Sequence, residues 1–145
     1  MNANRVMTRD VVCVAPETRV ARAWAILQKL RVRHLPVTQG GLLCGILSDR
    51  DFLVRGEMQK DGALLLPDIS AAEAMTLHPL TCPAGAPVSR IASLMLEHRI
   101  DSIPIVGLGG QLVGLITSAD LLELLTEPDS EPETLPFQFQ IEQAA

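Results

Sequence analysis

The chain has 145 residues, of which 48% are hydrophobic, and its formal net charge at pH 7 is −5. A chain of this length buries one substantial core, and it has no apolar run near the roughly 18 to 20 residues that cross a bilayer and no secretory-signal pattern, so a soluble, cytoplasmic protein without a membrane partner is expected. The acidic balance and the few aromatic residues, one Trp, three Phe and no Tyr, argue against a nucleic-acid partner.

The charge is distributed unevenly along the chain. Residues 1–60 carry ten Lys and Arg against five acidic residues, whereas residues 61–145 carry two Lys and Arg against twelve. An anionic ligand would therefore find its counter-charges mainly in the first half, and a solvated basic face is the alternative interpretation.

The candidate metal ligands are three cysteines and three histidines: Cys13, Cys44, Cys82, His34, His78 and His98. The cysteines are odd in number, lie in apolar, strand-like surroundings and show no Cys-x-x-Cys spacing, which is typical of reduced core thiols. No histidine has a partner at ligand spacing, so no metal site is predicted.

A short β-prone run over residues 11–14 is the first predicted element. Pro16-Glu17-Thr18 then predicts a helix start with Thr18 as N-cap, because a hydroxyl there accepts a bond from a free helix N–H. The apolar residues that follow at helical spacing form one stripe: Val20, Ala23, Trp24, Leu27 and Leu30. Trp24 is therefore expected in the core rather than as a platform for stacking.

Two apolar strands, Leu35–Thr38 and Leu42–Leu47, are predicted to form a hairpin that turns at Gly-Gly. A helix should begin at Ser48, and Gly56–Asp68 should form a loop that contains an apolar patch. Ser70-Ala71-Ala72-Glu73 has the form of a capping box that opens a short helix.

The second half repeats this order of elements. A helix with the apolar stripe Val88, Ile91, Ala92 and Met95 is predicted, with Pro87 suited to its first turn. Strands Ile103–Val106 and Leu112–Ile116 should form a second hairpin, and a last helix should run from Thr117 through Leu125.

The tail from Glu127 onward is acidic and punctuated by prolines, so its first part is expected to be flexible. The alternating Phe137, Phe139 and Ile141 suit an edge strand added to a partner or to the chain's own surface. A disordered end is the other possibility and the one predicted.

The strongest pattern is an internal repeat. Gly45-Ile46-Leu47-Ser48-Asp49-Arg50-Asp51 returns as Gly114-Leu115-Ile116-Thr117-Ser118-Ala119-Asp120. Equivalent residues differ by 68 up to Pro36 and Pro104 and by 69 from Gly45 and Gly114 onward, which places a one-residue insertion in the second hairpin loop. Two half-size units of the order strand, helix, strand, strand, helix are therefore predicted to share one core.

Two copies of apolar-x-Pro-x, a hairpin and Gly-apolar-apolar-Ser/Thr-x-x-Asp resemble a tandem pair of CBS domains, the Bateman module, over about residues 5–126. The resemblance implies an α+β fold in which repeat 1 (5–58) and repeat 2 (70–126) pack as a pseudo-two-fold pair. Residues 59–69 would form the inter-repeat loop, and residues 127–145 the tail. It also implies two clefts between the repeats that hold adenosine-containing ligands such as AMP, ADP, ATP or S-adenosylmethionine.

Twelve positions are predicted to contact such a nucleotide: Val12, Arg31, Arg33, His34, Ser48, Arg50, Asp51, Leu80, His98, Arg99, Thr117 and Asp120. In the family the aspartate that ends the motif accepts hydrogen bonds from both ribose hydroxyls, a role that suits an acceptor-only carboxylate. The motif hydroxyl lies near ribose and phosphate at a helix start, where backbone donors favour anions. The short strands at Val11-Val12 and Pro79-Leu80 would contact adenine.

Phosphate would be met by arginine, whose planar fork bonds two oxygens at once. The family's His-Arg pair at the end of the first helix is present as His98-Arg99, whereas the first repeat has Leu30-Arg31 there. Further positive charge near the first copy comes from Arg33, His34 and Arg50, so the two clefts are expected to differ.

Two functions remain open at this point. The first is a regulatory module for energy sensing, a homodimer that binds an adenosine nucleotide and modulates an unknown effector protein. The second is a ligand-free interaction module that acts through its dimer surface and tail, because Ser48-x-x-Asp51 and Thr117-x-x-Asp120 are also capping boxes.

An enzyme is not expected. The sequence has no nucleophile beside a base, no metal constellation and no phosphate-cradling Gly-x-x-x-x-Gly-Lys loop, so no catalytic cofactor is predicted. A pairing of His34 with Ser48 is discounted because Ser102 stands at the position of His34 in the second repeat.

Overall fold

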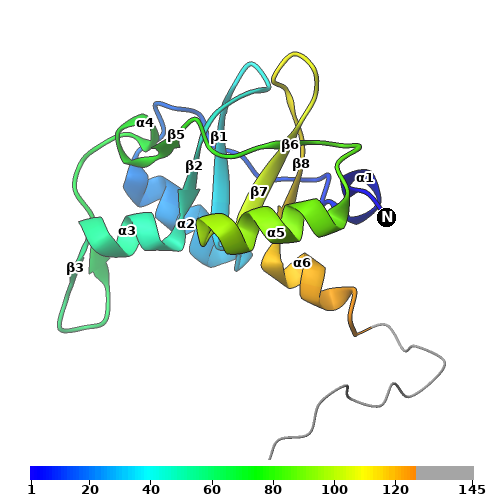
Figure 1. The fold of residues 1–145 in the computed structure, drawn as a ribbon. Coiled ribbons are helices and arrows are strands. Elements are labelled where there is room, and N and C mark those ends of the chain that lie inside the picture. Colours follow the sequence, from blue (N-terminus) through cyan, green and yellow to red (C-terminus); the bar gives the residue numbers. More distant parts are fainter. Residues whose placement is uncertain (127–145) are drawn as a thin grey trace, which may run out of the picture.

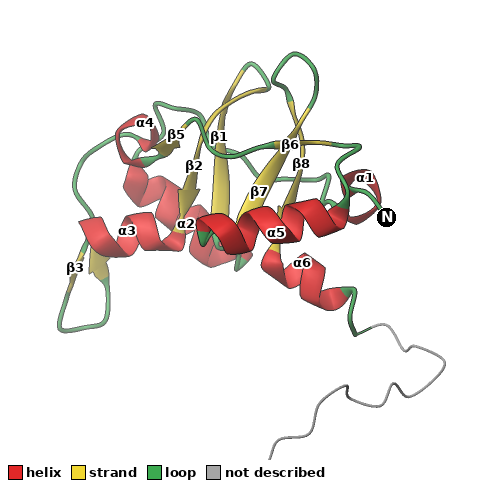
Figure 2. Cartoon of the chain, in the orientation of Figure 1, coloured by secondary structure: helices red, strands yellow, loops and turns green. Residues whose placement is uncertain are grey.

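The computed structural model describes residues 1–126, and the expectations for the tail from Glu127 lie outside the described residues. The elements of the first half are α1 Ala3–Val6, α2 Val20–Leu30, β1 His34–Gln39, β2 Leu42–Ser48, α3 Asp49–Arg55, β3 Glu57–Met58 and β4 Leu64–Leu65. Those of the second half are α4 Ala71–Ala74, β5 Thr76–Leu77, β6 Cys82–Pro83, α5 Val88–His98, β7 Ser102–Val106, β8 Leu112–Thr117 and α6 Ser118–Glu123. Figure 1 follows this order along the chain, and Figure 2 separates its helices from its strands. The predicted α+β class and the two repeats are confirmed.

Each repeat is built around an antiparallel hairpin. In the first, β1 pairs with β2, and the turn residues Gly40 and Gly41 have φ of +58° and +80°. Two successive residues with positive φ match the right-handed twist of a hairpin, which is why glycine occupies both positions. In the second, β7 pairs with β8 around the longer loop, where Gly107 N–H donates to the Gln111 carbonyl at 2.8 Å. The predicted insertion therefore lies in the turn.

The two hairpins stand side by side, and their tips are bonded to each other (Figure 1). Leu43 N–H donates to the Gly110 carbonyl at 3.1 Å, and Leu112 N–H donates to the Gly41 carbonyl at 3.0 Å. The open ends of both hairpins, where the motif helices begin, consequently lie together at the opposite end of the strands.

The repeats exchange their leading segments. Ala3 and Met7, which precede the first repeat's long helix, are buried in the core of the second repeat. Ala71 and Ala74 of α4, which precede the second repeat's long helix, are buried in the core of the first. Each core is therefore completed by residues of the other half, which makes the pseudo-two-fold pair one cooperative unit.

This exchange explains why Thr18 is not the N-cap of α2. The N-cap is Arg19, without a side-chain cap, and the Val20 N–H donates to the Ile69 carbonyl at 3.0 Å. At the equivalent place Pro87 is the N-cap of α5, and the Val88 N–H donates to a carbonyl of the exchanged N-terminal segment. A backbone acceptor from the other half thus replaces the predicted hydroxyl cap.

The glycine that opens each motif is required by the same exchange. A Cβ on Gly45 would lie 2.5 Å from Met75 Sδ, and a Cβ on Gly114 would lie 2.5 Å from Met7 Sδ. Met7 and Met75 occupy equivalent positions, so the glycine of each repeat accommodates a methionine of the other half's leading segment. The first residue of the motif is therefore a packing residue.

Several local predictions are corrected. Of residues 11–14 only Val14 is bridged, to Val37, while residues 11–13 belong to no helix or strand. The loop 56–68 contains the short hairpin β3–β4, and α6 ends at Glu123 rather than at Leu125. The secondary structure of these segments depends more on the residues that pack against them than on their own intrinsic propensities.

Side chains in the cores agree with the predicted stripes except at Leu30, which lies at the end of α2 and is 45% exposed. Trp24 packs on Phe52 with ring centroids 5.2 Å apart, so it is a core-packing residue as predicted. All three cysteines are free, with Cys82 buried and the other two half-buried. Burial raises the pKa of the Cys13 and Cys82 thiols, which favours their protonated form. Among residues 1–126 no helix is long and apolar enough to span a membrane.

Candidate functional site

Two clefts lie between the repeats, each containing one of the motif aspartates. The first, here called the Asp120 cleft, has a volume of about 320 Å³ and is lined by Thr117 and Asp120 of repeat 2 together with Val11, Val12 and Arg31 of repeat 1. Because residues of both repeats form its walls, a ligand held there would contact both at once.

The second, here called the Asp51 cleft, is larger, with a volume of about 880 Å³. Ser48 and Asp51 of repeat 1 line it together with Leu80, His98 and Arg99 of repeat 2. The two clefts are therefore related by the pseudo-two-fold symmetry, but they differ in size and in charge.

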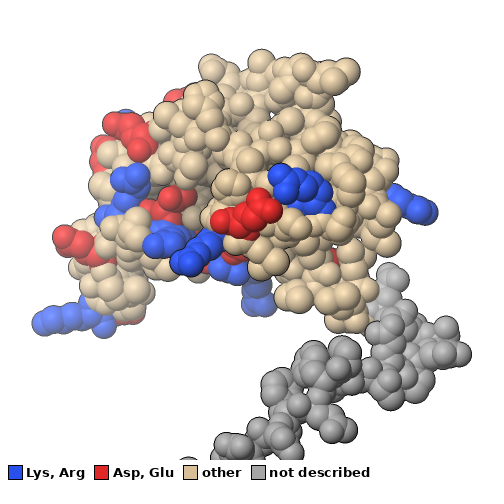
Figure 3. Space-filling model, in the orientation of Figure 1, with Lys and Arg blue, Asp and Glu red and all other residues tan. Residues whose placement is uncertain are grey.

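Charge concentrates at the cleft end of the molecule. Residues 34–48 and 102–116, which form the two hairpins, contain no Lys, Arg, Asp or Glu. Figure 3 accordingly shows uncharged hairpin tips, with the blue and red side chains of this face gathered below them. Both signs of charge are therefore available where the motif helices begin.

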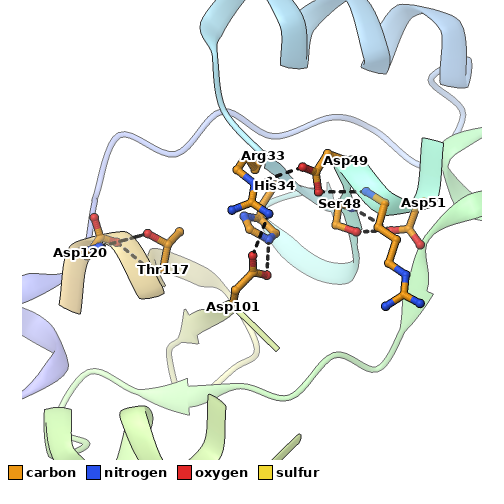
Figure 4. A network of polar contacts seen from close by, with 9 residues as sticks. Arg33, His34, Ser48, Asp49, Asp51, Asp101, Thr117 and Asp120 are labelled. Carbon is orange, nitrogen blue, oxygen red and sulfur yellow. Dashed lines mark hydrogen bonds and ion pairs between the residues drawn. The ribbon is translucent and has the colours of Figure 1, made fainter. Parts of the chain in front are cut away.

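Each motif aspartate caps its own helix through one oxygen. Asp51 Oδ2 accepts from Ser48 N–H at 2.8 Å and from Ser48 Oγ at 3.2 Å, and Asp120 Oδ2 accepts from Thr117 N–H at 2.7 Å and from Thr117 Oγ1 at 3.0 Å (Figure 4). Within residues 1–126 neither Oδ1 atom accepts a hydrogen bond. The capping role and a ligand-binding role therefore use different oxygens and are compatible.

The arginine that ends each long helix adopts the same unusual conformation. Arg31 has φ of 53° and Arg99 has φ of 52°, which is the left-handed region that side chains other than glycine enter at a cost on the order of 1 kcal/mol. Because the two arginines occupy equivalent positions, this left-handed turn is a structural feature common to both repeats. In each case the turn directs the chain back toward the interface between the repeats.

The arginines are not grouped by repeat in the way the sequence suggested. Arg31 lines the Asp120 cleft, whereas Arg50 and Arg99 line the Asp51 cleft. The reason is that each long helix ends at the interface, where the arginine at its C-cap lines the cleft that contains the other repeat's motif aspartate. Each cleft thus combines the aspartate of one repeat with the helix-end arginine of the other.

Three residues line both clefts: Arg33, His34 and Asp101. Arg33 Nη2 lies 3.3 Å from Asp101 Oδ2, and Arg33 Nε donates to Asp49 Oδ2 at 3.1 Å. The bond to Asp49 and the charges of Asp49 and Asp101 raise the pKa of Arg33 further above its ordinary value, so the guanidinium stays charged. His34 is only 8% exposed, and its Nε2 lies 2.8 Å from Asp101 Oδ1.

Backbone bonds hold this shared wall in a symmetric way. Asp49 N–H donates to the Arg33 carbonyl at 2.9 Å, and Ser118 N–H donates to the Asp101 carbonyl at 2.9 Å. These four positions are two equivalent pairs, so the start of each motif helix is tied to the strand of its own repeat. The ion pairs of Arg33 then connect the two repeats.

The twelve predicted positions all line one cleft or the other, and their binding role stays a prediction. Asp49 and Asp101 were missed, although they hold the only ion-paired arginine that lines the clefts within residues 1–126. The sequence did carry a signal for this ion pair: Arg33 and Asp101 are 68 residues apart, which makes them equivalent positions of the two repeats, and their side chains have opposite charges.

Residues 3–56 and 69–127 match the model of the CBS domain. The inosine-5′-monophosphate dehydrogenase of Korarchaeum cryptofilum is 30% identical over 126 residues, which are 87% of this chain and 25% of that protein. The chain thus spans about a quarter of the length of this relative. The CBS domain-containing protein YhcV of Bacillus subtilis is 29% identical over 116 residues, 79% of each chain.

Solved structures show the same fold. CBSX2 in complex with AMP has a TM-score of 0.74 and 24% identity, with 86% of this chain and 95% of that chain covered. The cytosolic domain of the Mg²⁺ channel MgtE in complex with ATP has a TM-score of 0.70 and 25% identity, with 85% and 48% covered. With two matched repeats that exchange their leading segments around a pair of clefts, the chain belongs to the CBS domain family.

Proposed function

We propose that the chain is a regulatory module that binds an adenosine-containing nucleotide in its inter-repeat clefts and modulates a partner protein. The observation that carries the proposal is the composition of each cleft. An aspartate with a free Oδ1 from one repeat shares the cleft with a helix-end arginine from the other repeat. No part of the proposal requires catalysis or a catalytic cofactor.

The groups in each cleft suit the parts of such a ligand. Asp51 and Asp120 offer a carboxylate oxygen to ribose hydroxyls, and Arg31 and Arg99 offer a bidentate donor to phosphate. An apolar wall for adenine is supplied by Val11 and Val12 in the Asp120 cleft, and by Pro79 and Leu80 in the Asp51 cleft. AMP bound to CBSX2 and ATP bound to the MgtE domain support this class of ligand.

Regulation follows from where the clefts lie. A ligand that contacts both repeats stabilises the arrangement of the repeats that fits it best, and it shifts the population toward that arrangement. In the proposal the shift is passed to an effector protein in the cytoplasm by a homodimer of the chain, so that the module reports the energy state carried by adenine nucleotides.

The test is a thermal-shift series with AMP, ADP, ATP and S-adenosylmethionine on the wild type and on Asp51→Asn and Asp120→Asn. Asparagine keeps an oxygen for the helix cap but removes the charge that faces the ribose. A ligand at a hundred times its Kd adds about 2.7 kcal/mol, which corresponds to roughly 2–8 °C in Tm for a domain of this size.

The matched control is Asp68→Asn, which changes an aspartate whose one ion pair within residues 1–126 is with Arg19 and which lines neither cleft. It should respond to ligand as the wild type does, whereas each cleft variant should lose part of the shift. If none of the four compounds raises the Tm of the wild type, the ligand-free interaction module becomes the better account.

A further inference from the structure

The wall shared by the two clefts joins them electrostatically. Arg33 and Asp101 occupy equivalent positions of the two repeats and meet each other at the interface, 3.3 Å apart. Arg33 also bonds Asp49 at the start of α3. In Figure 4 Arg33, His34 and Asp101 lie between Thr117–Asp120 on one side and Ser48–Asp51 on the other.

We propose that Arg33 is a phosphate-binding residue shared by both clefts, so that a nucleotide in the Asp120 cleft weakens the binding of a second nucleotide in the Asp51 cleft. The inference rests on the proposed nucleotide binding and adds to it a coupling between the two sites. It also assigns Asp49 and Asp101 as the carboxylates that transmit the coupling.

The guanidinium is free to move toward a ligand. The Arg33 side chain is 65% exposed, and it lines the Asp120 cleft beside Arg31. A phosphate in that cleft would lie in a pocket lined by both arginines and would compete with the two carboxylates for Arg33, because a phosphate offers a guanidinium two charge-assisted hydrogen bonds at once.

The carboxylates, in contrast, are held in place. Asp101 keeps its bond to the buried His34 at 2.8 Å, and its backbone carbonyl keeps the bond from Ser118 N–H. Asp49 keeps its bond to the Arg50 N–H at 2.9 Å. When Arg33 turns to the phosphate, both carboxylates therefore stay where they are and lose their counter-charge.

This loss determines the sign of the coupling. Asp49 and Asp101 both line the Asp51 cleft, so two negative charges no longer paired with Arg33 would face a phosphate arriving there. Like charges at this range disfavour binding, and linkage requires that a nucleotide in the Asp51 cleft weaken the Asp120 cleft by the same factor. An uncharged ligand leaves Arg33 in place, and its two binding events are therefore independent.

The expected size is modest because water and salt reach the wall. The side chains of Asp49 and Asp101 are 30% and 43% exposed, so the interaction is partly screened. At low ionic strength the affinity of the second cleft for nucleotide is expected to fall about fivefold, which is at the low end of measured couplings. The effect should shrink as salt is added.

The experiment is isothermal titration of the full chain with AMP and ATP, and with adenosine as the uncharged probe. Asp51→Asn and Asp120→Asn each leave one intact cleft and give its affinity in isolation. For the wild type with AMP or ATP, the second step should be about fivefold weaker than the isolated cleft, whereas with adenosine the two steps should match the isolated clefts.

Arg33→Gln removes the shared cation, so both clefts should bind AMP more weakly than in the wild type and should fill independently. Arg90→Gln is the matched control, since Arg90 also forms an exposed ion pair, with Glu97 at 3.4 Å, but lines neither cleft. It should retain the wild-type coupling.

The outcomes separate the two proposals. Absence of AMP, ATP and adenosine binding in every variant overturns the proposed function, and the coupling with it. Binding of AMP to two clefts that behave independently in the wild type, or a weaker second step that persists in Arg33→Gln or with adenosine, overturns the coupling alone.

Discussion

The two repeats are alike at some positions of their interface and opposite in charge at others. At equivalent positions 31 and 99 both carry arginine in the same left-handed conformation, and each lines a cleft. At equivalent positions 33 and 101 they carry Arg and Asp, which pair with each other across the interface. Positions that are alike in the two repeats therefore build the two clefts, whereas positions 33 and 101, which differ, join the repeats and make the clefts unequal.

The cores of the repeats are also unequal. In repeat 1 Trp24 and Phe52 form an aromatic pair, and Phe52 is 1% exposed. In repeat 2 the equivalent positions hold Ala92 and Leu121, and Leu121 is only half-buried. Repeat 1 therefore places a larger apolar side chain between α2 and α3 than repeat 2 places between α5 and α6.

Large-to-small substitutions in the two cores test this difference. Phe52→Ala should cost about 3–5 kcal/mol of unfolding free energy, because it removes a fully buried ring and leaves a cavity beside Trp24. Leu121→Ala should cost only about 1–2 kcal/mol, since a half-buried side chain loses less contact with the core. Urea unfolding of both variants, followed by circular dichroism, gives the two values.

Leu122→Ala serves as the control for α6, because Leu122 is 63% exposed and should change the free energy of unfolding little. Since each core is completed by the other half, both large-to-small variants should still unfold in one transition. Equal costs for Phe52→Ala and Leu121→Ala would contradict the comparison of the cores.

The next effect concerns the motif glycines. The three atoms nearest to a Cβ on Gly45 include the Thr76 carbonyl oxygen at 2.6 Å as well as Met75, whereas the three atoms nearest to a Cβ on Gly114 all belong to the side chain of Met7. A methionine can move and a strand carbonyl cannot, so Gly45→Ala should cost about 2–3 kcal/mol and Gly114→Ala about 1 kcal/mol.

Thermal unfolding of the two variants measures this second difference. Gly85→Ala is a suitable control, because a Cβ there meets no atom within 4 Å. Adding Met7→Ala to Gly114→Ala should reduce the clash, while adding Met75→Ala to Gly45→Ala should leave the contact with Thr76. A larger cost at Gly114 than at Gly45 would show that the backbone contact is not decisive.

These contacts also show how far the sequence could be interpreted alone. The hairpins, the helix starts at Ser48 and Thr117, and the capping box at Ser70 were predictable, because each depends on residues that are near one another in the chain. The motif glycine could be recognised because it recurs in both repeats. The reason for a glycine there could not be predicted, since Met75 contacts Gly45 only in the folded pair.

The wrong prediction at Thr18 and the omission of Asp101 both concern contacts between the two halves of the chain. Thr18 has the right hydroxyl for an N-cap, yet the N–H of Val20 is satisfied by Ile69 from the other half, which no local pattern reveals. In the clefts, the predicted residues were those alike in the two repeats or positively charged. Asp101 was missed because its charge is opposite to that of its equivalent residue, Arg33, and because a carboxylate is not a residue type expected to bind phosphate.

The two short helices of the exchanged segments, α1 and α4, differ in how they are capped. In α4 the Glu73 carboxylate accepts from Ser70 N–H at 2.8 Å and from Ser70 Oγ at 3.1 Å, whereas in α1 the equivalent residues are Asn2, which makes no side-chain cap, and Arg5. The hydrogen bond from the Ser70 backbone N–H, and to a smaller extent that from the Ser70 hydroxyl, holds the pKa of Glu73 below its ordinary value. Only one of the two leading helices therefore has an acid-sensitive cap.

A lowered pKa in the folded state means that the cap contributes its full stability above the pKa of an unfolded glutamate, about 4.3, and loses it as the pH falls through the lower folded value. The Tm difference between wild type and Glu73→Gln should therefore be greatest above about pH 5 and should shrink as the pH is lowered toward the acid end of the pH series. Ser70→Ala should keep most of the acid sensitivity, because the Ser70 N–H remains as a donor. Arg5→Gln, the matched change in α1, removes no carboxylate and should leave the acid limb of the wild type unchanged. A Tm difference between wild type and Glu73→Gln that grows toward low pH would reverse the sign and rule out Glu73 as a charged cap.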